Sequence, residues 1–142
     1  MTYYPIILVD SGILVAYYSN QDPYHQQVRI FFERCTSNLL TTTACITEVM
    51  WLLSDNWQTQ NLFLQAVAKG VFKAIALMPD DFSRIAKLNQ KYADLPGDFA
   101  DLSLIAISER LNIPAIATLD SDFDVYRRYQ RQPFERAFIP EI

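Results

Sequence analysis

Apolar residues occur along this chain in short uninterrupted runs, a pattern typical of strands that are buried on both faces of a sheet. The first run, residues 6–9, begins after Pro5 and ends abruptly at Asp10. Three further apolar or β-branched runs and a short last one predict strands at residues 39–43, 71–78, 113–118 and 138–139. A strand that delivers a carboxylate at its C-terminal end delivers it to the edge where open α/β sheets bind ligands.

Between these runs, apolar positions recur at helical spacing. Residue types that start or stop helices bound several of the segments, among them Asp22-Pro23, Thr43 as a cap and Gly70 as an end. The expected helices span residues 13–18, 23–35, 44–53, 58–68, 79–92 and 99–111. Strands that alternate with helices predict an α/β fold, with a mostly parallel sheet covered by helices on both faces.

The composition agrees with one folded domain spanning residues 1–142. The chain is 51% hydrophobic and 13% aromatic, has only three glycines, and contains no linker-like or repetitive stretch. No apolar run is long enough to span a bilayer and no secretory signal pattern is visible, so we expect a cytoplasmic protein without a membrane partner. Cys35, Cys45 and the single histidine, His25, form no zinc motif, and we interpret all three as packing residues.

The net charge of −4 excludes simple electrostatic attraction to a polyanion, so any nucleic-acid binding requires a local basic patch or bridging cations. Four arginines near the C-terminus, interleaved with aromatic residues, are the candidate patch: Arg127, Arg128, Arg131 and Arg136. Two interpretations stay open. The segment is either the solvated face of a helix, or a surface at which Arg127, Arg128 and Arg131 contact RNA or a partner protein.

Four acidic residues far apart in the sequence lie at C-terminal strand ends or in the first turns of the helices that follow: Asp10, Glu48, Asp101 and Asp120. Each has an ordinary explanation alone, as a turn former, a cap or an exposed helical acid. Asp98 is the natural N-cap of the helix at residues 99–111, and Asp122 is the expected cap of a short helix from Phe123.

Together, these acids predict a metal site. Two unit charges about 4 Å apart repel by about 4 kcal/mol at an effective dielectric constant of about 20, and a divalent cation removes the conflict. Oxygen ligands without a His or Cys cluster favour Mg²⁺ or Mn²⁺. Such an ion suits phosphodiester hydrolysis, because it lowers the pKa of a bound water and neutralises charge on the phosphoryl oxygens.

Four segments in order along the chain resemble the signature blocks of PIN-domain ribonucleases, in particular the toxins of type II VapBC-like toxin–antitoxin pairs: VDSG at 9–12, TEV at 47–49, DFADLSLIA at 98–106 and TLDSDF at 118–123. The resemblance implies a three-layer α/β/α PIN-like fold, a Mg²⁺ or Mn²⁺ site and metal-dependent cleavage of RNA. It also implies a small antitoxin protein as partner.

Carried over by position, the resemblance makes Asp10 and Asp101 the principal metal ligands. Glu48 becomes a ligand or an orienter of bound water, and Asp120 the fourth acid. Four further residues are candidates for supporting roles, with the choice between Asp120 and Asp122 left open: Ser11, Asp98, Thr118 and Asp122.

Two rival functions remain at this stage. One is a PIN-like binding module without catalysis. The other is a receiver-type signalling domain, which would need a Lys beyond the last strands, whereas the last Lys here is Lys91. We also expect a homodimer, because related domains commonly pair and the chain has more large apolar side chains than a small monomer readily buries, including Trp51, Trp57, Phe63 and Phe72.

Overall fold

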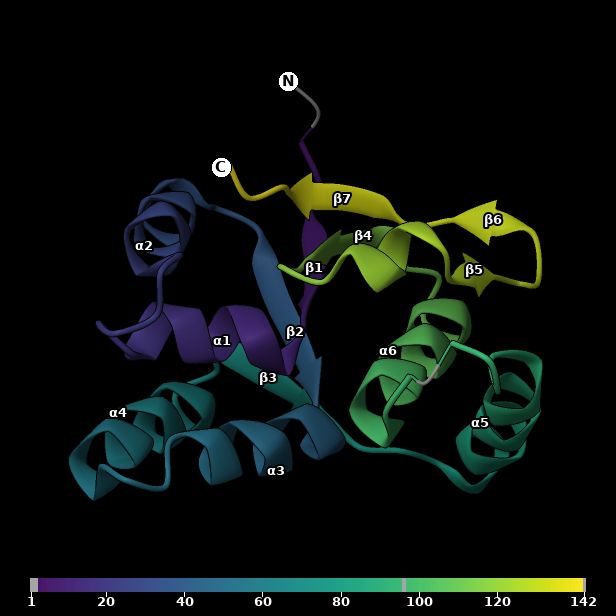
Figure 1. Ribbon diagram of the computed structural model, residues 1–142, viewed down its shortest axis with the longest axis horizontal. Helices are drawn as coiled ribbons and strands as arrows, with labels where there is room; N and C mark the ends of the chain where they lie inside the picture. Colours follow the sequence, from purple (N-terminus) through teal and green to yellow (C-terminus); the bar gives the residue numbers. More distant parts are fainter. Residues whose placement is uncertain (1–2, 96, 142) are drawn as a thin grey trace.

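The computed structural model describes residues 3–95 and 97–141 and confirms the three-layer α/β/α fold (Figure 1). The central sheet has five parallel strands in the order β3-β2-β1-β4-β7. Their bounds are β1 Ile6–Val9, β2 Asn38–Thr42, β3 Phe72–Ile75, β4 Ala115–Ala117 and β7 Glu135–Phe138. Because all five strands are parallel, their C-terminal ends lie at one edge of the sheet.

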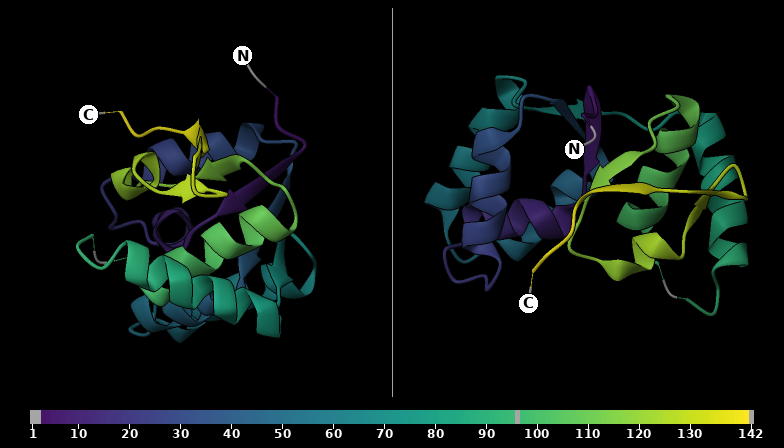
Figure 2. Two further views of the ribbon diagram at one scale, coloured as in Figure 1. Left: turned by 90° about the vertical axis from the view of Figure 1, so that its right-hand side faces the viewer. Right: turned by 90° about the horizontal axis from the view of Figure 1, so that it is seen from above.

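Helices cover both faces of this sheet, as the two further views in Figure 2 also show. One layer contains α1 Ser11–Tyr18, α2 His25–Arg34, α3 Thr43–Leu52 and α4 Trp57–Ala68. The other contains α5 Pro79–Lys91 and α6 Phe99–Arg110. The layers follow from the sequence, because successive strand residues point to opposite faces. Ile7 and Val9 of β1 belong to the apolar cluster under α1–α4, whereas Leu8 belongs to the cluster under α5 and α6.

Three helices start at polar side chains next to the C-terminal edge of the sheet. The carboxylate of Asp10 accepts from the backbone N–H of Ile13 at 3.0 Å, and that of Asp98 accepts from the N–H of Asp101 at 2.8 Å. The hydroxyl of Thr42, rather than that of Thr43, caps α3 by accepting from the N–H of Cys45 at 3.2 Å. These caps satisfy N–H groups that a helix leaves unpaired. They also fix where the polar side chains lie.

Several expected boundaries were wrong by a few residues. Helix α2 begins at His25 rather than Pro23, because the Asp22 carboxylate accepts from the N–H of Tyr24 and forms a turn first. Strands β3 and β4 are shorter than expected, and the last strand lies at Glu135–Phe138 rather than 138–139. A 3₁₀ helix follows β4 at Ser121–Asp124.

The interpretation of the arginine-rich segment as a helix face was also wrong. The segment forms a two-stranded antiparallel hairpin, β5 Arg127–Arg128 and β6 Gln132–Pro133, next to α5 and α6. Its loop contains Tyr129 and Gln130, which both have positive φ values, of 49° and 71°. A loop with this left-handed backbone is a tight turn and cannot continue a helix.

The residues expected to pack do so. The ring Nδ1 of His25 lies 2.7 Å from the carbonyl oxygen of Ala16, which joins α2 to α1. Cys45 is buried and Cys35 is half-buried, and both are free thiols. In the described part of the chain, none of the helices has the length and apolar character required to cross a bilayer.

Candidate active site

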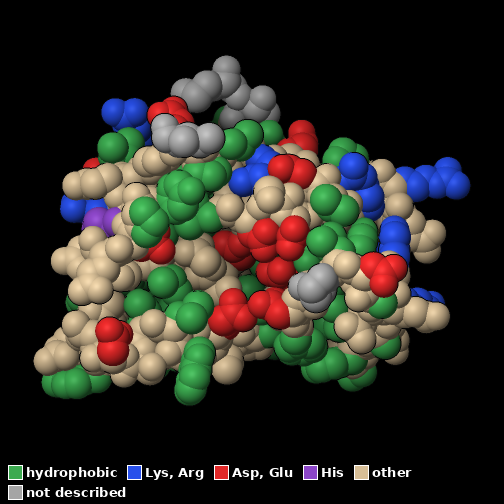
Figure 3. Space-filling view, in the orientation of Figure 1, with side chains coloured by type: hydrophobic (Ala, Val, Ile, Leu, Met, Phe, Trp, Pro, Cys, Tyr) green, Lys and Arg blue, Asp and Glu red, His purple; other side chains and the backbone are tan. Residues whose placement is uncertain are grey.

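The acids named in the sequence analysis come together at the C-terminal edge of the sheet. A cavity of about 250 Å³ lies there, and eight residues line it: Asp10, Ser11, Gly12, Glu48, Asp98, Asp101, Leu119 and Asp120. Figure 3 shows Asp and Glu side chains gathered in a hollow at the centre of this face. Residues separated by more than 100 positions therefore share one small volume that is rich in negative charge.

Asp10 occupies the innermost position, with 4% of its surface exposed. It lies between the end of β1 and the start of α1, so one carboxylate oxygen, Oδ1, caps the helix. The other, Oδ2, accepts a hydrogen bond from the hydroxyl of Thr118, which follows β4. Since β1 and β4 pair in parallel at this edge, the sheet itself holds Thr118 beside Asp10.

Glu48 reaches the cavity from α3 and is half-buried. Its carboxylate accepts a hydrogen bond from the hydroxyl of Ser11. Burial raises the pKa of Glu48, although the hydrogen bond from Ser11 opposes the shift. Helices α1 and α3 contact each other, and this packing brings the Ser11 hydroxyl to an acid 37 residues away.

Asp98 and Asp101 both line the cavity from the first turn of α6, where the helix dipole favours negative charge. One carboxylate oxygen of Asp101 lies 3.4 Å from the hydroxyl of Tyr126, a residue that is fully buried. Tyr126 was not predicted to contact the site, because its segment was interpreted as a helix face. Gly97 packs against this tyrosine, and a Cβ at that position would lie 2.3 Å from the hydroxyl oxygen.

Asp120 lines the cavity, whereas Asp122 is not among the lining residues. The carboxylate of Asp120 caps the 3₁₀ helix by accepting from the N–H of Asp122 at 2.9 Å, so the expectation that Asp122 caps a helix from Phe123 was wrong. The N–H of Asp120 donates to the Thr118 hydroxyl at 2.9 Å. Thr118 therefore connects Asp10 and Asp120.

The electrostatics of the cavity disfavour four ionised acids. Burial, with the added charges of Asp98 and Asp10, raises the pKa of Asp101 from 3.8 to about 8. Burial also raises the pKa of Asp10 to about 6, although the hydrogen bond from Thr118 opposes this shift. A carboxyl group whose pKa is raised by burial and by other acids is one that a cation would stabilise in its ionised form.

The donor chemistry fits a hard divalent cation, because every charged group that lines the cavity is a carboxylate. Within residues 3–95 and 97–141, however, no three His, Cys, Asp or Glu side chains are arranged to hold an ion as they stand. Three of the carboxylates accept hydrogen bonds from hydroxyl groups: Asp10 from Thr118, Glu48 from Ser11 and Asp101 from Tyr126.

The four C-terminal arginines do not form one patch. The Nη1 of Arg127 donates to the carbonyl of Asp124 and to two further carbonyls of its own segment. Arg128 is 3% exposed and its Nη2 donates to the Ser108 carbonyl, so the expectation that it contacts RNA or a partner does not fit its burial. Arg136 pairs with Asp124 and donates to the Thr118 carbonyl, leaving Arg131 as the exposed member.

The chain matches one family model and several solved structures. The family model described as PIN domain matches residues 7–129. A crystal structure of VapC20 from Mycobacterium tuberculosis, described as a sarcin-ricin loop cleaving toxin, superposes with a TM-score of 0.79 at 16% identity, covering 89% of this chain and 99% of that one.

Two further solved structures share the fold. A toxin–antitoxin complex from Klebsiella pneumoniae has a TM-score of 0.64 at 17% identity, covering 81% of this chain and 87% of that one. VapBC2 from Rickettsia felis, bound to a DNA fragment from its promoter, has a TM-score of 0.64 at 13% identity, covering 92% and 98%. A comparison with curated proteins gave no match.

Proposed function

The chain belongs to the PIN domain family, and on that premise we propose that it is a Mg²⁺- or Mn²⁺-dependent endoribonuclease that acts as the toxin of a toxin–antitoxin pair. The observation that carries this proposal is the convergence of acids from four separate segments, Asp10, Glu48, Asp98–Asp101 and Asp120, on one cavity. Nothing in the local sequence requires these segments to meet. Mutually repelling acids that a fold brings together are typical of a functional site.

In this proposal Asp10 and Asp101 hold the ion, and Glu48 and Asp120 complete its surroundings. A bound Mg²⁺ or Mn²⁺ supplies positive charge to the phosphoryl oxygens and lowers the pKa of a coordinated water. The protein's own hydroxyls have a separate task. Thr118 fixes one oxygen of Asp10, and Ser11 fixes one oxygen of Glu48, so each acid presents a defined face to the cavity.

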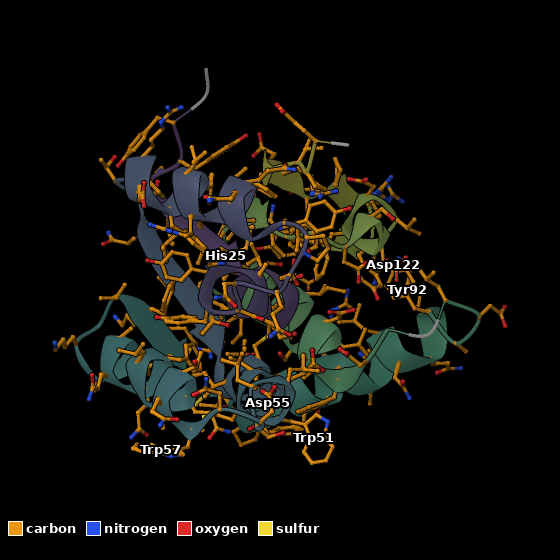
Figure 4. The ribbon with its side chains drawn as sticks, turned by 60° about the vertical axis from the view of Figure 1, so that its left-hand side comes forward. His25, Trp51, Asp55, Trp57, Tyr92 and Asp122 are labelled. Carbon is orange, nitrogen blue, oxygen red and sulfur yellow. The ribbon has the colours of Figure 1, made fainter. Side chains whose placement is uncertain are left out.

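An antitoxin partner is part of the proposal. Two of the structures similar to this chain are toxin–antitoxin assemblies by their descriptions. The outer surface of α3 and α4 also carries large apolar side chains that a monomer leaves in water. Trp51 is 76% exposed and Trp57 is 64% exposed, and Figure 4 shows both at the edge of the molecule, with Asp55 between them. Exposed aromatic residues of this kind are frequent at protein interfaces.

The homodimer expected from the sequence stays a prediction. Two of the four residues that suggested it, Phe63 and Phe72, are buried in the core, whereas Trp51 and Trp57 are exposed. Of the four side chains that suggested self-association, only the two tryptophans are therefore available for an interface. A single sedimenting species of monomer mass at high micromolar concentration would contradict it.

RNA cleavage by purified protein tests the enzymatic proposal. We expect cleavage with Mg²⁺ or Mn²⁺, none in EDTA, and a loss of more than ~100-fold in Asp101→Asn, because a ligand should matter more than a group that merely orients one. The control is Asp55→Asn, which removes the same charge from an exposed position outside the cavity. Unchanged cleavage in Asp101→Asn would refute the proposed site.

Growth of cells that express the protein tests the toxin proposal. Wild type without its partner should arrest growth, and Asp101→Asn at the same expression level should not. Equal arrest by both variants would contradict a toxin that acts through this cavity. A folded wild type that binds Mn²⁺ yet cleaves no RNA would favour the rival binding module.

A further inference from the structure

Many positive charges of the described chain are already engaged within the protein. Among the described residues, ion pairs are formed by four arginines: Arg29, Arg84, Arg110 and Arg136. Arg128 is buried, and the guanidinium of Arg127 is held by backbone carbonyls. These cations support the fold, so they are poorly placed to neutralise a ligand.

A different set of cations remains exposed around the β5–β6 hairpin. Lys87 and Lys91 lie four residues apart on one face of α5, and Arg131 lies in the hairpin loop. The Nζ of Lys91 donates to the carbonyl of Gln130 at 3.3 Å, which places the end of α5 beside this loop. We name these three cations, Lys87, Lys91 and Arg131, the basic ridge.

Two contacts place the hairpin relative to the acidic cavity. Tyr126 joins the chain just before the hairpin to Asp101, through the 3.4 Å contact between its hydroxyl and the carboxylate. The hairpin loop in turn packs on the end of α6, where the N–H of Tyr129 donates to Glu109 at 2.7 Å. Asp101 and Glu109 are eight residues apart on this helix, or about 12 Å.

Basic side chains lie on the same face of the molecule as the acidic hollow (Figure 3). In Figure 3, Lys and Arg side chains lie to the right of the central acidic hollow, over the region of α5 and the hairpin. A strand only a few nucleotides long could reach from one to the other. The remainder of this face offers a polyanion little attraction, because the chain carries a net charge of −4.

We propose that the basic ridge binds the phosphodiester backbone of the RNA strand whose scissile phosphate enters the acidic cavity. This inference rests on the proposed function and adds the path of the substrate to it. Cations beside the cavity would orient a polyanion that the acids alone repel, and they carry no sequence preference, since phosphate contacts position a strand without reading its bases. The ridge differs from the arginine patch expected from the sequence, because two of its three members come from α5.

The test uses RNA binding by a catalytically silenced protein. In an Asp101→Asn background, Lys87, Lys91 and Arg131 are all changed to Gln, and Arg127 is left intact because it binds the backbone of residues 124–126, just before the hairpin. The matched control changes Arg34, Lys69 and Lys73 to Gln. These are three exposed cations on other elements, so both variants have the same net charge. Binding of an unstructured RNA oligonucleotide is measured by fluorescence anisotropy across a range of KCl concentrations.

We expect the ridge variant to bind RNA about tenfold more weakly or worse, whereas the control keeps the affinity of the parent. The slope of log affinity against log salt should fall by about 2 in the ridge variant, because each single-strand phosphate contact contributes ~0.7. Mn²⁺ affinity, measured without the Asp101→Asn change, should equal that of the wild type. Binding of polyglutamate to the same variants is also measured, as the probe for an acidic polypeptide partner.

Three results would overturn the inference. The first is an unchanged RNA affinity in both the ridge and the control variants, and the second is an equal loss of RNA affinity in both. The third is a loss of polyglutamate binding with RNA binding retained. The last result would assign the ridge to an acidic protein partner. Failure of the ridge and failure of the nuclease proposal remain distinguishable, because wild-type cleavage is measured independently. If the wild type cleaves RNA and the ridge variant binds RNA normally, only the proposal for the basic ridge is refuted.

Discussion

The acids and the arginines of this protein behave in opposite ways. Asp10 and Asp120 are 110 residues apart, yet both line one cavity. Arg127 and Arg128 are adjacent, yet one is held by carbonyls at the surface of its own segment and the other is buried under the hairpin. In both sets, separation along the sequence is therefore a poor guide to proximity in the folded protein.

The difference has a topological cause. Asp10 and Asp120 follow strands, and Asp98 and Asp101 open α6, at one edge of a parallel sheet, so the fold determines their positions and the pattern of strands reveals them. Glu48 reaches the same cavity from the second turn of α3. The arginines lie in a short hairpin, where the orientation of each side chain depends on a tight loop that no periodicity predicts. Residues that the sheet topology brings together are therefore a better guide to function than residues of one type that are neighbours in the sequence.

The largest effect that separates the arginines is on stability. Arg128→Met should lower the free energy of unfolding by about 2 kcal/mol, because the buried Nη2 donates to the Ser108 carbonyl at 3.2 Å and to Asn112 Oδ1 at 3.1 Å. Arg131→Met should change it by no more than ~0.5 kcal/mol, since the side chain is exposed. Denaturant unfolding of both variants measures the difference. Equal free energies of unfolding in the two variants would mean that the two arginines contribute equally to stability.

A smaller effect, on Mn²⁺ affinity, should distinguish two buried threonines at the sheet edge. Thr118→Val should weaken Mn²⁺ binding by about tenfold, because its hydroxyl holds Asp10 and accepts from the N–H of Asp120. Thr41→Val is the matched control: its hydroxyl is also buried, but it has no hydrogen-bond partner among the described residues. Calorimetric titration compares the two variants. Equal affinities would exclude a positioning role for Thr118.

A third effect is on the pH dependence of stability. Burial raises the pKa of Asp10 to about 6 and that of Asp101 to about 8, from 3.8 in the unfolded chain. Between these values the folded state binds more protons, so their contribution lowers the free energy of unfolding as pH rises from about 4 toward 8. The metal-free protein should therefore melt at a lower temperature at pH 8 than at pH 5.

Two comparisons make this pH test specific to the cavity. Asp101→Asn should show a shallower decline in melting temperature, because one of the two titrating groups is gone. Added Mg²⁺ should stabilise the wild type more at pH 8 than at pH 5, since ionised carboxylates bind it better. The same decline in wild type and Asp101→Asn would show that these pKa values do not govern stability.

Much of the fold was predictable because local patterns and tertiary structure agree. The run at residues 6–9 is a central strand, and Asp98 caps α6 as expected. The acids could be proposed as one site for the same reason. Interactions between distant segments could not be predicted, such as the hydroxyl of Tyr126 beside Asp101 or the engagement of Lys91 with the hairpin loop. Both depend on the path of a hairpin whose sequence has no helical or strand periodicity.

Calorimetric titration of Mn²⁺ into wild type, Asp10→Asn and Asp55→Asn tests the central claim most directly. Asp10 is buried in the cavity, whereas Asp55 is exposed outside it, so both substitutions remove one carboxylate but only one alters the site. We expect wild type and Asp55→Asn to bind Mn²⁺ equally, and Asp10→Asn to lose more than ~100-fold in affinity. Equal binding by all three proteins would contradict a metal site built from the converging acids.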